Sequence, residues 1–194
     1  MTTAIRTSIC CLLLFCVPLM ANADAGQWRT EMGYRFLNNT DELKDICEHI
    51  SENAGKGGDV HKASINLNIQ PYHQFENGFQ AGAGIGPFVL IAGDTWHLLV
   101  PMNVTLGWAF FTRSPVSPYV KAGISYHFSD GEYQAESTPG VYTGIGIRLF
   151  NMKALKLGME IAYDSARIEL YDAIERKEHS LHTGELTLGI FADF

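Results

Sequence analysis

The chain has few cysteines, a deficit of basic residues and an N-terminal apolar run too short for a membrane-spanning helix. Three of its four cysteines lie within the first 16 residues, and only Cys47 follows them. The rest of the chain therefore cannot form an intramolecular disulfide, and we expect Cys47 to be a passive thiol. Lys and Arg total 14 against 21 Asp and Glu, an acidic balance that argues against nucleic acid as a partner.

The apolar run nearest the N-terminus covers only residues 9–20. Arg6, the only charge among the first 23 residues, precedes it, and Ala-Asn-Ala at 21–23 follows it. A spanning helix needs about 20 apolar residues, whereas this arrangement is typical of a secretory signal peptide. We predict a signal peptide over 1–23, cleaved after Ala23. One domain over 24–194 would then carry 13 basic and 21 acidic residues, a net charge of −8.

Charge is also missing from two internal stretches, residues 77–93 and 95–112. They could be read as two transmembrane helices, but Pro87 and Pro101 would each remove a hydrogen bond in mid-helix. The two-residue spacing of a strand is instead shown by Gly82, Gly84 and Gly86. The sequence therefore favours strands in both stretches.

Alternation of apolar and polar residues marks eight segments in all. They cover residues 26–37, 60–74, 78–91, 96–111, 118–129, 140–150, 154–169 and 181–194. Each is about as long as a transmembrane strand, which needs about 9–11 residues. Lipid cannot hydrogen-bond exposed backbone, so a spanning sheet must close on itself. We predict an all-β fold, an eight-stranded antiparallel up-and-down transmembrane β-barrel.

One side of these segments is almost wholly apolar, and the other carries five cations and five anions. The ten charged residues are Arg29, Glu31, Arg35, Lys121, Arg148, Lys156, Glu160, Asp164, Glu185 and Asp193. The interior of an eight-stranded barrel is just wide enough for side chains to fill, and buried charges must be paired. We expect the apolar side to face lipid and paired charges to fill the interior, which disfavours a pore.

Aromatic residues gather at both ends of the segments. One end carries Trp28, Tyr72, Phe75, Phe79, Trp108, Phe110, Phe111, Tyr119, Phe150 and Phe194. The other carries Phe36, Trp96, Tyr126, Phe128, Tyr142, Tyr163 and Tyr171. The links at the first end are short, while those at the second are longer and charged, apart from the short link at 92–95. Two aromatic girdles and unequal loops are typical of an outer-membrane barrel.

The long first loop, residues 38–59, contains a predicted short helix. The apolar residues Leu43, Ile46, Cys47 and Ile50 have helical spacing. Thr40 or Asp41 before them is suited to be the N-cap. This helix would fold over the mouth of the barrel or lie on headgroups or a partner.

Acidic and histidine residues recur in the other long loops. They are Asp130, Glu132, Asp172, Glu175, Glu178, His179 and His182. Divalent cations could bridge them to lipopolysaccharide, but no spacing matches an EF-hand or a zinc motif. We expect a solvated acidic rim with no cofactor and no metal site.

The strands at 117–128 (SPYVKAGISYHF) and 140–150 (GVYTGIGIRLF) and the terminal LTLGIFADF resemble small bacterial outer-membrane β-barrels of the OmpA/OmpX-like type. The resemblance implies a porin-like barrel in the outer membrane of a Gram-negative cell envelope. It also implies that Phe194, with apolar residues at every second position before it, is the recognition signal for the barrel-assembly machinery.

A second resemblance is to lipid A deacylase barrels of the PagL type, which carry a His-x-Ser pair and a Glu on another strand. Here His127 and Ser129 lie two residues apart, but their face points inward by the alternation. The penultimate segment, where that family has its pair, contains no histidine at 160–170.

We therefore expect an outer-membrane barrel without catalytic residues, with a structural, adhesive or envelope-protective role exercised through its loops. Its expected partners are outer-membrane lipids and lipopolysaccharide. The alternatives are a lipid A-modifying hydrolase in the same barrel and a soluble lipocalin-like carrier with its apolar side inside.

Overall fold

The computed structural model describes residues 26–37, 40–56, 60–94, 96–131, 134–150, 156–172, 174–182 and 186–194. The predicted signal peptide and Glu132 and Glu185 lie outside these ranges. Within the described residues, no helix is both long and apolar enough to cross a bilayer.

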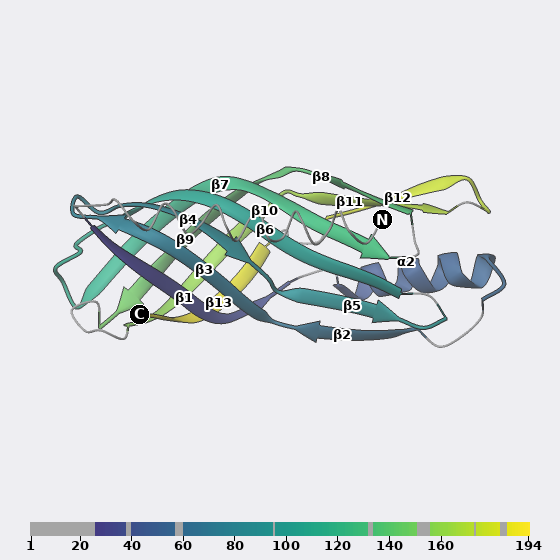
Figure 1. Ribbon diagram of the computed structural model, residues 1–194, viewed down its shortest axis with the longest axis horizontal. Helices are drawn as coiled ribbons and strands as arrows, with labels where there is room; N and C mark the ends of the chain where they lie inside the picture. Colours follow the sequence, from purple (N-terminus) through teal and green to yellow (C-terminus); the bar gives the residue numbers. More distant parts are fainter. Residues whose placement is uncertain are drawn as a thin grey trace.

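The strands trace a closed antiparallel barrel (Figure 1). They are β1 (Gly26–Phe36), β2 (His61–Ile65), β3 (Leu67–Phe75), β4 (Phe79–Ile85), β5 (Phe88–Ala92), β6 (Trp96–Ala109), β7 (Val116–Gly131), β8 (Gln134–Thr138), β9 (Gly140–Leu149), β10 (Lys156–Asp164), β11 (Arg167–Asp172), β12 (Lys177–His182) and β13 (Leu186–Asp193). The one described helix is α2 (Thr40–Asn53).

Several of these strands are successive pieces of one barrel strand, so the fold is an eight-stranded barrel as predicted. β2 leads into β3, β4 into β5, β8 into β9, β10 into β11 and β12 into β13. The sheet closes where β13 pairs with β1, with Met32 opposite Ala192. The barrel strands lie in chain order around the ring, as an up-and-down topology requires.

The predicted faces are confirmed along the main part of the barrel. Val104 is 65 % exposed and the adjacent Thr105 only 4 %. In β10, buried and exposed residues alternate without exception from Lys156 to Asp164. Alternation that puts Leu, Ile, Met and Val outside and charges inside is suited to lipid and excludes the soluble lipocalin-like arrangement.

Both ends of the barrel carry exposed aromatic rings, in agreement with the predicted girdles. At the end with the short turns these include Trp108, Phe110, Phe111, Phe150 and Phe194, and at the other Phe36, Trp96, Tyr126 and Tyr163. The prediction was wrong for Tyr72, Tyr119 and Tyr142, which are at most 3 % exposed and lie inside the barrel.

The end of the barrel away from the short turns extends into a cap, which we define as α2, β2, β5, β8, β11, β12 and the adjoining end of β6. In Figure 1 it lies at the right, away from the C-terminus. β2 and β5 pair along one edge with β6, and β8, β11 and β12 form a separate three-stranded sheet. β5 and β6 stay paired as far as Ala92 opposite Trp96, so both strands extend into the cap on either side of this short link.

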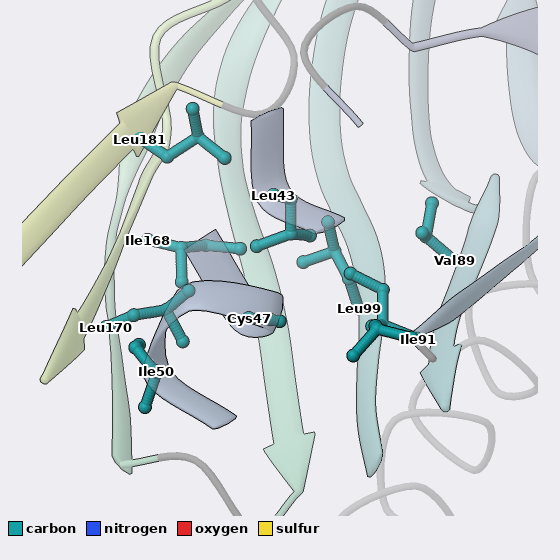
Figure 2. Close-up of a cluster of buried hydrophobic side chains, with 10 residues drawn as sticks. Leu43, Cys47, Ile50, Val89, Ile91, Leu99, Ile168, Leu170 and Leu181 are labelled. Atoms are coloured by element: carbon teal, nitrogen blue, oxygen red, sulfur yellow. The ribbon is translucent and has the colours of Figure 1, made fainter. Parts of the chain in front are cut away.

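The cap has its own apolar core, and α2 lies inside it (Figure 2). Leu43, Cys47 and Ile50 project from α2. They pack with residues of both sheet edges, namely Val60, Val89, Ile91, Leu99, Ile168, Leu170 and Leu181. The prediction of a helix folded over the barrel's own mouth is therefore confirmed.

This core corrects one prediction from the sequence. We expected paired charges to fill the interior, but the inward-facing positions become apolar in the cap. On one continuous inward row, Glu160 and Asp164 are followed by Ile168 and Leu170. The change occurs because α2, and not water or another charge, is the neighbour at this height.

The outer surfaces of the two cap edges differ. Ile65, Leu90 and Trp96 on β2, β5 and β6 are 64 %, 40 % and 41 % exposed, so this edge stays apolar on its outer face. The β8–β11–β12 edge instead presents Arg167 and Glu169, opposite Thr138 and Glu136 of β8. One side of the barrel therefore carries a taller apolar wall than the other.

Candidate functional site

The interior of the barrel is filled by an ionic belt, formed by the predicted charges Arg29, Glu31, Arg35, Lys121, Arg148, Lys156, Glu160, Asp164 and Asp193. Its most connected member is Glu160 of β10, which is 2 % exposed. Arg35 and Lys121 contact its two oxygens at 2.6 and 2.5 Å. The hydroxyls of Tyr119 and Tyr142 donate to the same oxygens at 2.7 and 2.6 Å. Each carboxylate oxygen thus has one cation and one hydroxyl.

Glu31 of β1 forms a second junction of the belt. Its oxygens lie 2.5 Å from Nη2 of Arg148 and 3.3 Å from Nζ of Lys121. The Arg148 guanidinium, 1 % exposed, also stacks over the rings of Tyr119 and Tyr72 at 4.1 and 5.0 Å. Buried arginine requires such partners, because an unpaired buried charge costs several kcal/mol.

Asp193 is the third junction, near the end of β13. Its carboxylate accepts from Arg29 at 2.7 Å and from the Tyr72 hydroxyl at 2.8 Å. Arg148 and Lys156 lie 3.4 and 4.0 Å away. The predicted pairing of interior charges is confirmed for eight of the nine predicted residues that the structure describes, while Asp164 lies beside His127 instead of a lysine or arginine.

The belt leaves little free space. A cavity of about 10 Å³ lies within it, lined by Glu31, Gln70, Tyr72, Gln80, Gly82, Thr105, Gly107, Lys121 and Arg148. That volume holds about one water molecule, so this cavity has no room for a substrate or for a hydrated ion.

His127 and Ser129 face the interior, as the alternation predicted. His127 Nε2 lies 3.0 Å from Asp164 Oδ2, whereas Ser129 Oγ lies 2.9 Å from Nε2 of His97. The hydroxyl of Ser125 also bonds to Asp164. Asp164 and Ser129 therefore contact two different histidines, whereas in a serine hydrolase one histidine contacts both the acid and the serine.

The predicted loop residues separate into two groups. Asp130 lies at the end of β7, Glu178 is exposed on β12, and His182 ends that strand. The other three, Asp172, Glu175 and His179, converge at the tip of the β11–β12 hairpin together with His49 of α2. Sequence spacing could not reveal this cluster, because His49 belongs to a different loop and only the packing of α2 brings it there.

The side chain of Asp172 is fully covered and well bonded. Asn53 donates to Oδ2 at 2.7 Å, and the backbone N–H groups of Ile174 and Glu175 donate to Oδ1 at 2.8 and 3.1 Å. The hydrogen bond from Asn53, with those from the backbone, lowers the pKa of Asp172. A carboxylate is therefore held in its ionised form beside two histidines.

No protein-family model and no curated protein sequence matches the chain. Solved structures do. The outer membrane protein AlkL, determined by solid-state NMR in DMPC lipid bilayers, aligns with a TM-score of 0.55 and 13 % identity, over 90 % of this chain and 92 % of that chain. The outer membrane protein OprG from Pseudomonas aeruginosa aligns with a TM-score of 0.49 and 10 % identity, over 87 % and 92 %. Neisserial surface protein A gives 0.44 and 10 %, over 86 % and 92 %.

The closed ring, the lipid-suited outer face and the likeness to AlkL together define the class. The chain has the fold of the small eight-stranded outer-membrane β-barrels. At this level of identity the likeness concerns the fold alone, and the chain's activity has to be argued from its own residues.

Proposed function

We propose that the protein is a non-conducting, non-catalytic outer-membrane barrel that anchors its cap on the cell surface. In this view the mature chain begins after Ala23, the short turns face the periplasm and the cap faces outward. Its role is structural, adhesive or envelope-protective, and it is exercised by the cap.

The observation that carries the proposal is that the barrel is closed in two successive layers. The ionic belt fills the membrane-spanning part, and α2 with its apolar core covers the mouth above it. A transport or pore function would need an open path through both layers, and catalysis would need a cleft with a nucleophile beside a base. The contacts of the described residues support neither an open path through the two layers nor a cleft that a substrate could enter from the lipid.

Conductance tests the first half of the proposal. The mature protein, inserted into planar lipid bilayers, should give no single-channel currents above the bare-membrane background. Steady ohmic channels from a preparation that shows heat-modifiable migration on gels would contradict the proposal, because folded barrels would then be conducting.

A cap variant tests the second half. Cells producing the whole protein should be compared with cells producing a chain in which a short Gly-Ser link replaces residues 40–56. Surface adhesion or resistance to envelope stress should fall to the level of cells without the protein, while the barrel remains in the outer membrane. Full activity of the variant would show that the cap is not the working part.

A lipid A-modifying hydrolase is the second candidate, and the 2.9 Å contact between Ser129 and His97 favours it. It is the weaker candidate because both side chains face the interior, away from lipid. Mass spectra of lipid A from cells with and without the protein should be identical. A change in acyl chains that Ser129→Ala abolishes would establish the enzyme instead.

The partners follow from the same placement. We infer that outer-membrane lipids surround the apolar wall and lipopolysaccharide contacts the cap. Phe194 is 52 % exposed, while its backbone pairs with Thr30 through two hydrogen bonds of 2.9 and 3.2 Å. Its ring is thus free to be read from outside the barrel, which suits a signal for the barrel-assembly machinery. A lower outer-membrane level of the Phe194→Ala variant would be the expected result.

A further inference from the structure

The tip of the cap brings together four side chains that each ligate metals. His49 comes from α2, Asp172 from the end of β11, Glu175 from the hairpin turn and His179 from β12. One donor atom from each lies within 4.8 Å of all the others. Two imidazoles with two carboxylates are a ligand set for a divalent first-row transition ion such as Zn²⁺.

His49 already lies against one carboxylate of the cluster. Its Nε2 lies 3.3 Å from the carboxylate of Glu175, an acceptor, and 3.2 Å from the side-chain amide nitrogen of Asn53, a donor. A cation shared by His49 and Glu175 would bind the nitrogen lone pair and the carboxylate at once.

His179 supplies an independent observation. Its Nε2 is shielded from solvent and has no hydrogen-bonding partner among the described residues. The ring stands edge-on to that of His49, with centroids 6.0 Å apart. A polar nitrogen that is buried without a partner destabilises the fold, and a metal bond would satisfy it.

The surroundings fix the carboxylate ligand in place. Asn53 and the backbone N–H groups after Asp172 bond to its oxygens, as outer partners commonly do for metal-ligating carboxylates. Metal–ligand bonds of about 2.0–2.1 Å would need the four donors to draw together by about an ångström. His49 and Glu175, both exposed, are the side chains with room to make that movement.

We propose that His49, Asp172, Glu175 and His179 form a zinc-class metal site that ties α2 to the β11–β12 hairpin. The bound ion would hold the last turns of α2, which carry His49, against the tip of the cap. The site goes beyond the anchoring role, since it makes the shape of the cap depend on metal.

The test uses the full mature chain, produced without a histidine tag, folded in detergent micelles and freed of metal by chelation. Isothermal titration with ZnCl₂ should show one ion per chain. His49→Ala and His179→Ala should each weaken binding by at least about tenfold, the loss seen when even an outer partner is removed. The matched control is His61→Ala, an exposed histidine of β2 outside the cluster.

A second comparison on the hairpin uses Glu175→Gln, with Glu178→Gln as its control. If a histidine variant fails to fold, as judged by the loss of heat-modifiable migration, this second comparison decides the test. In the unmutated protein, zinc should also slow trypsin cleavage at Arg176 and Lys177. Absence of zinc uptake by the unmutated protein, or equal affinity in the cluster variants and their controls, would overturn the site.

Discussion

Phe191 is the one aromatic residue of β13 that points into the barrel, and a glycine opposite makes room for it. A Cβ atom built on Gly158 would lie 2.2 Å from the Phe191 ring. On the neighbouring inward position of β13, a Cβ on Gly189 would come no closer than 3.7 Å to any atom. Phe191 also packs edge-on against Tyr119, with ring centroids 6.3 Å apart.

We predict that Gly158→Ala destabilises the barrel and Gly189→Ala does not. The added methyl group at 158 must displace an enclosed ring, and such overpacking costs about 1–3 kcal/mol. Urea unfolding of the protein in lipid vesicles, followed by tryptophan fluorescence, gives both midpoints. Equal midpoints for the two variants would contradict the packing described for Phe191.

Glu160→Gln should be among the most damaging conservative substitutions in the chain. The amide keeps the shape but leaves Arg35 and Lys121 without the carboxylate that both contact. Breaking a buried ion pair from one side costs about 3–5 kcal/mol. The control is Glu169→Gln on the outer face of the cap, expected to change stability by about 0.5 kcal/mol or less. A small effect at 160 would mean that water, not protein, solvates the two cations.

Alternation along the strands was enough to predict the belt, because a period of two fixes the face of every charge. The same rule could have placed Tyr119 and Tyr142 inside, since they share parity with Lys121 and Arg148. Their position along the strand, taken alone, instead assigns them to the girdles. Which charges pair was beyond the sequence, because partners such as Glu31 and Arg148 meet only across the closed ring.

At the scale of elements, α2 is an amphipathic helix whose apolar side is enclosed by the cap. Cys47 lies at the centre of that side and is 0 % exposed. Burial raises the pKa of its thiol to about 12, so the thiolate fraction at neutral or mildly alkaline pH is far below that of an exposed cysteine. The burial of the sulfur and its low thiolate fraction both slow its reaction with electrophilic reagents.

Maleimide should therefore label Cys47 of the folded protein at pH 8 much more slowly than the urea-unfolded chain. Ile168→Ala, which opens the core against α2, should speed labelling, whereas Ile65→Ala, exposed on the outer face, should not. Rapid labelling of the unmutated folded protein would show that α2 leaves the cap readily.

The helix itself was predictable, because its apolar spacing and N-cap lie within one short stretch of chain. Its burial partners were not, since they come from β5, β6, β11 and β12. The breaks between β4 and β5 and between β10 and β11 were also missed. Each break occurs where the interior changes from polar to apolar, and this change is defined by α2. The cluster at the cap tip was missed for the same reason.

Across the whole molecule, the apolar wall is taller along β2, β5 and β6 than along β8, β11 and β12. A barrel with unequal walls can reduce the mismatch by tilting in the bilayer or by thickening the lipid locally. We predict that a spin label at Leu90 contacts lipid, while a label at Glu169 on the opposite cap edge contacts water. Oxygen and nickel-chelate accessibilities in lipid vesicles distinguish the two environments. Equal aqueous exposure at both sites would mean that the apolar outer surface has the same height on both sides of the barrel.

The three junctions of the belt each join strands that are distant in the chain, with Glu31 meeting Arg148 and Asp193 meeting Arg29 only after the first and last strands have paired. A partly closed sheet would therefore expose unpaired charged side chains to the lipid hydrocarbon. A partly inserted intermediate of this chain is therefore unstable. The pairing of the interior charges and the closure of the ring must occur together, so insertion into the bilayer proceeds in a single step.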